Sequence, residues 1–297
     1  MKISVADEIG NFFLARQSIL DENLKIYAYE LFYRSENSFT NASFADDLSA
    51  TATVIVNALG EFGLNNLTQD YRCFINVSSS ILVSEAIEII PSEKVILEIT
   101  EHTIIDDAII NRCKALKAMG FELSINKFTY NPSYDQLLPL LDYIKINASL
   151  MLPEQISTET ETIKMHSDAI LIAEGIEIVS DFNICKLHGF SYFQGYYFDR
   201  PYLFHICNPT TQYWALVSLL DRLMNDTDLD ELVEDLENNL ALSLCIYRLI
   251  MSRTPAKSVN THSLRETLLA VGKEDLTKWI QLLLLARKPK HLRKFIF

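Results

Sequence analysis

Short apolar runs that each carry a polar residue near their C-terminal end recur through the first two hundred residues, and this repetition constrains the fold most strongly. The strand-like runs occupy 26–34, 73–78, 95–100, 122–128, 143–147, 169–176 and 191–198. Their polar residues are Glu30, Asn76, Glu98, Asn126, Lys145, Glu174 and Gln194. Helical patterns over 49–62, 106–120 and 180–189 alternate with the runs, as is typical of a parallel sheet with crossover helices. We therefore predict an α/β fold, a TIM-like (β/α)8 barrel whose polar strand ends meet at one face.

The pattern changes after Pro201. Helical periodicity covers 228–251, 262–271 and 273–286, and Gly272 separates the last two segments. No strand-like run follows Pro201. These features predict a barrel domain over residues 1–205 and a small all-helical domain over residues 206–297.

Charge and cysteine content narrow the class of protein. The 297 residues have a formal net charge of −13 and no basic tract within the barrel region, which disfavours nonspecific nucleic-acid binding and suits docking onto a basic partner. The five cysteines are scattered without CxxC spacing, so neither a disulfide framework nor a zinc site is expected. The first ten residues lack the apolar core of a signal peptide, and no apolar run approaches the roughly 20 residues that span a bilayer. We expect a cytoplasmic protein that does not associate with membranes.

Six motifs follow one another along the barrel region. They are LARQSILDENLKIYAYELFYR (14–34), FINVS (74–78), LEITE (97–101), KIN (145–147), AEGIE (173–177) and QGYYFDRP (194–201). In this order they resemble the EAL domain of cyclic di-GMP phosphodiesterases. The resemblance covers about residues 10–201. The helical remainder resembles part of an HDOD domain, a catalytically silent relative of HD hydrolases, as in EAL-HDOD proteins.

The resemblance implies a two-cation active site, but the metal ligands are incomplete. In active EAL domains two divalent cations, usually Mg²⁺ or Mn²⁺, bridge the scissile phosphate and activate a water. The corresponding ligands Glu30, Asn76 and Glu98 are retained, whereas the family's two consecutive aspartates are replaced by Asn126 and Lys127. The family also implies roles in water positioning, base or loop anchoring, and the pocket wall for residues that are kept here: Lys145, Glu174, Glu177 and Gln194.

The two replacements disfavour a cation on physical grounds. Asn126 removes a negative charge that would offset a dication, and the ammonium of Lys127 adds repulsion. Two unit charges about 4 Å apart interact by roughly 4 kcal/mol at an effective dielectric constant of 20. Alternatively, Lys127 could take the metal's place and pair with Glu30 or Glu98. No cofactor is expected, and Mg²⁺ or Mn²⁺ would bind only if residual activity remains.

Several functions therefore remain open. The main hypothesis is a catalytically inactive EAL-like signalling regulator that does not hydrolyse cyclic di-GMP and acts by binding another protein, such as a transcription or signalling regulator. The alternative is a cyclic di-GMP receptor that holds the dinucleotide at the barrel mouth, where the resemblance implies contacts from Gln17, Arg34 and Gln194. A weaker alternative is a slow metal-dependent phosphodiesterase.

Overall fold

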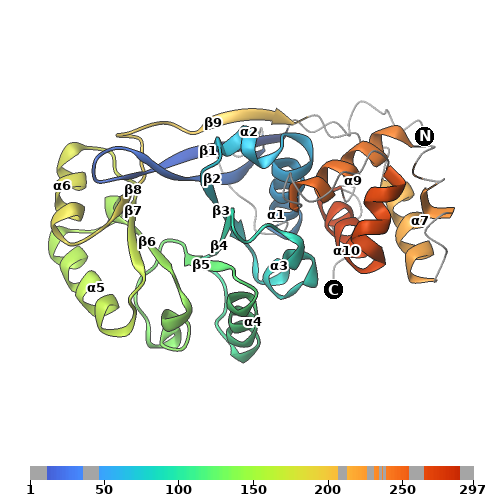
Figure 1. The fold of residues 1–297 in the computed structure, drawn as a ribbon. Helices are drawn as coiled ribbons and strands as arrows, with labels where there is room; N and C mark the ends of the chain where they lie inside the picture. The colour runs from blue at the N-terminus through green and yellow to red at the C-terminus, as the bar shows by residue number, and fades with distance from the viewer. Residues whose placement is uncertain are drawn as a thin grey trace, which may run out of the picture.

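The computed structural model describes residues 12–35, 47–206, 213–225, 231–233, 236, 239–253 and 264–287. Nine strands form one sheet in these residues, and its first eight strands close into a barrel (Figure 1). The strands are β1 (Phe12–Asp21), β2 (Ile26–Ser35), β3 (Arg72–Val77), β4 (Val95–Ile99), β5 (Glu122–Ile125), β6 (Tyr143–Asn147), β7 (Ile170–Glu174), β8 (Tyr192–Phe193) and β9 (Tyr202–Ile206). The predicted α/β barrel is thus confirmed.

The strand order is β2-β3-β4-β5-β6-β7-β8-β1, and β1 pairs again with β2 to close the ring. Strands β2 to β8 are parallel, whereas β1 is antiparallel to both of its barrel neighbours and also pairs with β9. β1 lies outside the predicted runs because Gln17 and Ser18 interrupt its apolar pattern. Both side chains are buried and hydrogen-bonded to Asp199, so polar residues are accommodated within this strand.

Helices and short helical turns cover the outside of the barrel (Figure 1). The helices are α1 (Asp47–Val56), α2 (Leu64–Thr68), α3 (Ser79–Val83), α4 (Asp107–Ala118), α5 (Pro153–His166) and α6 (Val179–Leu187). The short turns are η3 (Asn57–Glu61), η4 (Glu85–Ile89), η5 (Pro132–Tyr134), η6 (Leu138–Leu140) and η7 (Ala148–Leu150). The side chain of Asp106 accepts a hydrogen bond from the Ile109 amide and caps α4, and Gly120 at φ 91° follows its last turn. The predicted helices over 106–120 and 180–189 correspond to α4 and α6.

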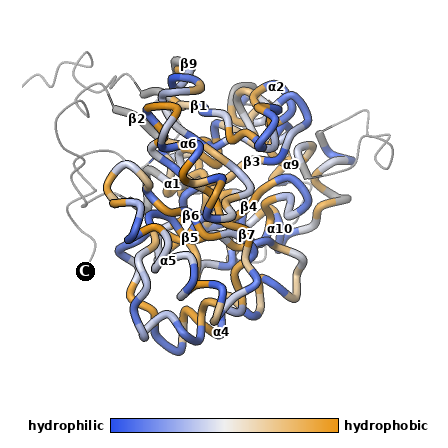
Figure 2. Tube along the Cα trace, turned by 90° about the vertical axis from the view of Figure 1, so that its left-hand side faces the viewer, coloured by the Kyte–Doolittle hydropathy of each residue, from blue (hydrophilic) through white to orange (hydrophobic). Residues whose placement is uncertain are grey.

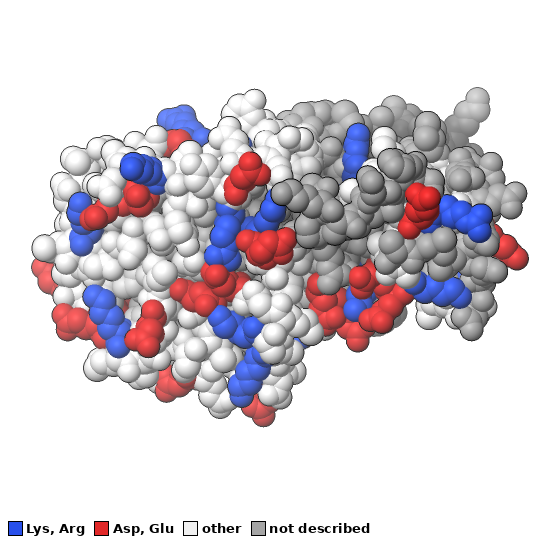
Figure 3. Space-filling view, in the orientation of Figure 1, with Lys and Arg blue, Asp and Glu red and all other residues white. Residues whose placement is uncertain are grey.

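The barrel has two apolar layers because successive strand residues point to opposite faces. One layer fills the interior with Ile19, Ala28, Phe74, Ile96, Tyr143 and Ile172. A larger layer lies between the strands and the surrounding helices. Figure 2 shows hydrophobic residues along the central strands, and Figure 3 shows acidic and basic side chains interspersed over the described part of one face.

A helical region follows the barrel and packs beside α1 (Figure 1). It contains α7 (Tyr213–Met224), α9 (Leu240–Arg253) and α10 (Leu264–Ala286). Gly272, at φ 78°, kinks α10 where the sequence predicts a break between two helices. A Cβ atom on Gly60 of η3 would lie 3.0 Å from Leu249 Cδ2, so the missing side chain permits the close approach of α9. The helical region is present as predicted, but the expectation that no strand follows Pro201 is wrong, because β9 begins at Tyr202 and pairs with β1. The proposed boundary between residues 205 and 206 stays a prediction.

None of the helices in the described ranges has the length and the apolar character that are needed to cross a membrane.

Candidate functional site at the barrel mouth

A cleft of about 520 Å³ lies at the C-terminal ends of the barrel strands. It is lined by Gln17, Glu30, Phe32, Asn76, Asn126, Lys127, Asn147, Ser149, Glu174, Gly175, Glu177, Gln194, Gly195 and Tyr196. Register explains this convergence, because Asn76 pairs with Glu98 across β3 and β4, and Asn147 pairs with Glu174 across β6 and β7. The structure therefore brings the predicted polar strand ends together, and Glu98 and Lys145 lie buried beneath the cleft.

Glu30 is the centre of the hydrogen-bond network. Its carboxylate accepts from Asn76 Nδ2 at 3.0 Å, Gln194 Nε2 at 2.8 Å and Lys145 Nζ at 2.9 Å. Burial raises the pKa of this carboxyl, but the Lys145 charge and the three donors outweigh burial and lower the pKa below its usual value. Glu30 is therefore a carboxylate over the physiological pH range.

Lys145 provides the ammonium group that lies between the acidic side chains. Its fully buried Nζ atom lies 2.9 Å from Glu30 Oε2 and 2.5 Å from Glu98 Oε2, and 4.8 Å from the centre of the Phe74 ring. Burial lowers the pKa of Lys145, but the neighbouring carboxylates of Glu30, Glu98 and Glu174 outweigh burial, so the net pKa is raised. The expectation that Lys127 pairs with Glu30 or Glu98 is therefore wrong, because Lys145 already contacts both.

Lys127 instead lies at the edge of the mouth. Its Nζ atom is 3.1 Å from Glu101 Oε1, and half of its side chain is exposed. Its backbone has φ 45°, in the left-handed region that side-chain-bearing residues rarely adopt. The next amide, that of Phe128, donates to the Lys145 carbonyl oxygen at 2.8 Å, so the chain turns sharply toward β6 at this residue.

Asn126 follows the last residue of β5 and faces the network. Its backbone amide donates to the Ile99 carbonyl oxygen at 3.0 Å, and its Nδ2 donates to Asn76 Oδ1 at 3.2 Å. Its Oδ1 atom is buried and accepts no hydrogen bond within the described part of the chain. The same is true of Gln194 Oε1 and of Glu98 Oε1. Together with Asp199 Oδ1, these buried acceptor atoms lack a donor among the described residues.

The remaining predicted site residues occupy different positions around the cleft. Burial raises the pKa of Glu98 to about 8 and that of Glu174 to about 7, although Lys145 opposes both shifts. Glu177 is exposed at the rim. Gln17 is buried, donates to the Asp199 carbonyl oxygen at 3.1 Å and accepts from Gln194 Nε2 at 3.2 Å. Arg34 pairs with Phe13 in the β1–β2 hairpin, but its side chain lies outside the described residues, so its phosphate contact stays a prediction.

The residues present do not fit the two-cation site that the EAL resemblance implies. Within the residues that the structure describes, no group of three or more His, Cys, Asp or Glu side chains is arranged to hold a metal ion. The positions that the resemblance assigns to two aspartates hold the amide of Asn126 and the ammonium of Lys127, which is paired with Glu101. Lys145 is a position that the family retains, so its contacts do not distinguish an active site from an inactive one. The disagreement with a metal site rests on Asn126 and Lys127.

Two residues that shape the mouth, Asp199 and Gly195, were not assigned a role from the sequence. Asp199 accepts hydrogen bonds from Ser18 Oγ at 2.5 Å and from the Ser18 amide at 3.3 Å, which ties the loop after β8 to β1. A Cβ atom on Gly195 would lie 2.1 Å from the Ile176 carbonyl oxygen. Gly195 therefore permits the loops after β7 and β8 to touch. Asp199 and Gly195 both belong to the QGYYFDRP motif, which is the sequence signal that could have identified them.

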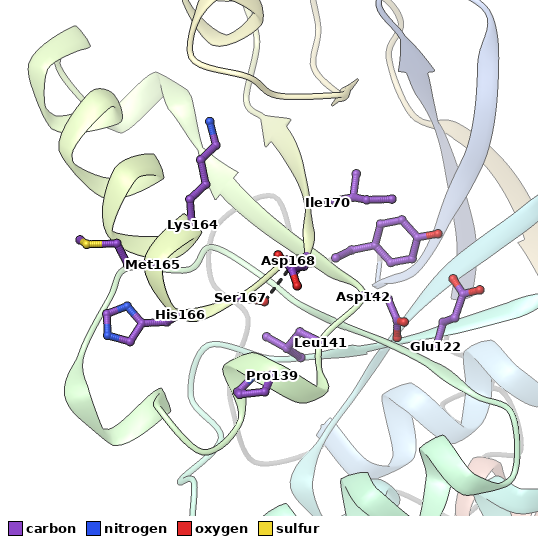
Figure 4. A pocket seen from close by; sticks show the side chains of 12 residues that line it. Glu122, Pro139, Leu141, Asp142, Lys164, Met165, His166, Ser167, Asp168 and Ile170 are labelled. Carbon is purple, nitrogen blue, oxygen red and sulfur yellow. Dashed lines mark hydrogen bonds between the residues drawn. The ribbon is translucent and has the colours of Figure 1, made fainter.

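A second pocket, of about 640 Å³, lies at the opposite end of the barrel (Figure 4). Glu122, Asp142 and Ile170, near the starts of β5, β6 and β7, contribute to its lining, and none of the predicted site residues does. Because catalytic residues of barrel enzymes come from the C-terminal strand ends, the mouth is the stronger candidate site.

Comparison with known proteins identifies the family of the barrel. The model of the EAL domain family matches residues 3–201. The uncharacterized protein YuxH of Bacillus subtilis is 29% identical over 278 residues, which span 91% of this chain and 67% of YuxH. The cyclic di-GMP phosphodiesterase CdgJ of Vibrio cholerae is 25% identical over 292 residues, spanning 96% of this chain and 68% of CdgJ.

A solved structure agrees with the fold. The YkuI protein of Bacillus subtilis, with an EAL domain and in complex with substrate c-di-GMP and calcium, matches with a TM-score of 0.53 at 17% identity. The match covers 80% of this chain and 73% of YkuI. At this identity the similarity shows a shared fold.

Proposed function

Because the chain belongs to the EAL domain family, we propose that it is a member that does not hydrolyse cyclic di-GMP and acts instead by binding another protein. The observation that carries this proposal is the Asn126-Lys127 pair in place of two metal-binding aspartates. An amide cannot supply the negative charge that a hard dication favours, and the Lys127 ammonium repels such an ion at the mouth. The role would be that of a cytoplasmic bacterial signalling regulator, whose partner is a transcription or signalling protein.

The helical region fits the same proposal. We assign residues 206–297 to a partial HDOD-like domain, which would add binding surface rather than chemistry. Its packing against α1 and η3 keeps it beside the barrel, as Thr53 Oγ1 donates to the Ala286 carbonyl oxygen at 3.2 Å.

A hydrolysis assay tests the proposal directly. The full chain is incubated with cyclic di-GMP and either Mg²⁺ or Mn²⁺, and formation of the linear dinucleotide pGpG is followed. We expect no turnover above a protein-free control. Linear product that accumulates in proportion to protein concentration contradicts the proposal and favours a slow phosphodiesterase, as CdgJ's name describes for that relative.

A second candidate function is a cyclic di-GMP receptor without hydrolysis. The observation that favours it is the intact wall of the cleft, where Gln17, Gln194 and Glu30 form one hydrogen-bonded chain. Calorimetry with tens of micromolar cyclic di-GMP separates the two candidates. Heat that disappears in Arg34→Ala supports the receptor, and no heat supports the protein-binding role.

A further inference from the structure

The rim of the mouth exposes large apolar side chains on three consecutive loops. Leu150 and Leu152 follow β6 with 78% and 64% exposure, and Ile178 and Val179 follow β7 with 57% and 53% exposure. Tyr196 follows β8 with 54% exposure. Scattered exposed apolar residues are ordinary on a protein surface, but a contiguous group beside a cleft is typical of an interaction site.

Backbone contacts make these three loops one surface. The Ile176 amide donates to the Gln194 carbonyl oxygen at 3.1 Å, and the Tyr197 amide donates to the Ile176 carbonyl oxygen at 3.0 Å. A Cβ atom on Gly175 would lie 2.6 Å from Asn147 Oδ1, so the loops after β6 and β7 also touch. The apolar rim is defined as Leu150, Leu152, Ile178, Val179 and Tyr196. Tyr196 itself lines the cleft, and the other four residues lie on the two loops that line it with Ser149 and Glu177.

Among the described residues, the cleft beside this rim has buried acceptor atoms without a donor and more acidic than basic side chains. Asn126 Oδ1 and Gln194 Oε1 are buried acceptors without a donor among the described residues, and their side chains are 9% and 5% exposed. The described charged groups at and beneath the mouth and its rim include the carboxyl groups of Glu30, Glu98, Glu101, Glu174, Glu177 and Asp199 and the cations of Lys127, Lys145 and Arg200. An occupant that donates several hydrogen bonds and carries positive charge would complement this site.

We propose, resting on the proposed protein-binding function, that the mouth receives an arginine side chain of a partner protein whose flanking apolar residues pack on the rim. A guanidinium has five N–H donors and no acceptor, so it matches unpaired acceptors beside carboxylates. An arginine anchor surrounded by apolar contacts is also the usual composition of a binding hot spot. A divalent cation would complement the mouth less well than a guanidinium, because the paired aspartates that would bind it are absent.

A peptide probe tests the charge requirement. Fluorescence anisotropy of the full chain is measured with labelled acetyl-Leu-Gly-Arg-Gly-Leu-amide and with the same peptide carrying citrulline, a neutral analogue of similar shape. We expect the arginine peptide to bind at least tenfold more tightly. Equal affinity of the two peptides overturns the inference, as does displacement of the arginine peptide by millimolar Mg²⁺.

Matched variants test the location. Glu174→Gln and the double variant Leu150→Ser with Tyr196→Ser are each expected to weaken the arginine peptide at least threefold. Leu187→Ser removes a leucine that is 82% exposed at the other end of α6 and should leave the affinity unchanged. Equal effects of all three variants overturn the location. Sedimentation that shows a dimer lost in Leu150→Ser overturns it as well, because a second copy then occupies the rim.

Failure of this inference is distinct from failure of the proposed function. A chain that hydrolyses cyclic di-GMP contradicts the proposed function whatever the peptides do. A chain without turnover that binds both peptides equally contradicts only the arginine site.

Discussion

The two ends of the barrel treat buried polar groups differently. At the N-terminal ends of the strands, Glu122 pairs with Arg72 at 2.8 Å and Asp142 pairs with Lys117 at 2.6 Å. The hydroxyl groups of Tyr27 and Tyr143 form a hydrogen bond across the barrel axis, with their oxygen atoms 2.5 Å apart. At the mouth, Lys145 contacts two carboxyl groups, and acceptor atoms on Asn126, Gln194 and Glu98 have no donor among the described residues.

The proposed binding role of the mouth would account for this difference. Each of the two strand-start carboxylates has its own partially exposed cation, which closes that end of the barrel with little buried charge. Within the described residues, the mouth leaves several buried acceptors unpaired, whereas at the strand starts a donor, Arg72 Nε, is buried without a partner. An unpaired buried polar group costs about 1–3 kcal/mol. Stability alone does not favour such an arrangement, whereas a ligand that donates hydrogen bonds would use it.

The largest expected effect is a gain of activity at the mouth. Replacing Asn126→Asp together with Lys127→Asp restores two negative charges and removes the ammonium. The added carboxylates are the hard, negatively charged ligands that a dication favours, and the ammonium that is now paired with Glu101 is removed. We expect at least a hundredfold rise in pGpG formation with Mn²⁺, measured by chromatography.

The control for this gain is Glu30→Gln in the double variant, which should abolish the new activity. A folded double variant that remains inactive would show that the loop after Lys127 is also unsuited to catalysis. In that case the loss of two metal ligands alone would not explain how the mouth differs from the opposite end of the barrel.

Removal of one cation from each end tests the comparison through stability. Lys145→Met leaves Glu30 buried without its ammonium, and breaking a buried ion pair costs about 3–5 kcal/mol. Lys117→Met breaks a partly exposed pair, which contributes about 0–1 kcal/mol. Urea denaturation of both variants should show this difference in the free energy of unfolding, and equal losses would contradict it.

The sequence predicted the convergence of the mouth but not its pairing. Strand spacing and polar strand ends were sufficient to place Glu30, Asn76, Glu98 and Lys145 at one end of the barrel. The C-terminal ends of barrel strands meet at one face whatever contacts their side chains make. Whether Lys127 or Lys145 lies between the carboxylates depends on φ at Lys127 and on side-chain direction, and neither has a sequence pattern.

Long-range contacts and local polarity explain what else was missed. β1 contains Gln17 and Ser18, whose partner Asp199 is about 180 residues away in the sequence, so their burial had no local signal. The unpaired acceptors likewise become visible only when the neighbours of Asn126 and Gln194 are in place.

A pH dependence is expected from Glu98, because burial raises its pKa to about 8 from its ordinary value of 4.5. Because the folded state holds the proton more tightly, this group's favourable contribution is present below pH 4.5 and is lost as pH rises toward 8. Glu98→Gln removes this loss. The free energy of unfolding of the variant relative to wild type should rise by on the order of 2 kcal/mol between pH 5 and pH 8. Parallel curves from urea denaturation at each pH would contradict the assignment.

The smallest expected effect concerns the backbone at the mouth. Lys127 has φ 45°, which costs a residue with a side chain about 1–2 kcal/mol, whereas glycine adopts it freely. Its exposed ion pair with Glu101 contributes about 0–1 kcal/mol. Lys127→Ala loses the ion pair and keeps the strain, while Lys127→Gly loses the ion pair and relieves the strain. Since glycine also gains freedom in the unfolded chain, we expect Lys127→Gly to be about 1 kcal/mol more stable than Lys127→Ala in urea denaturation. If the two variants unfold at the same urea concentration, the turn at Lys127 is not strained, and the mouth then differs from the opposite end of the barrel only in its polar pairing.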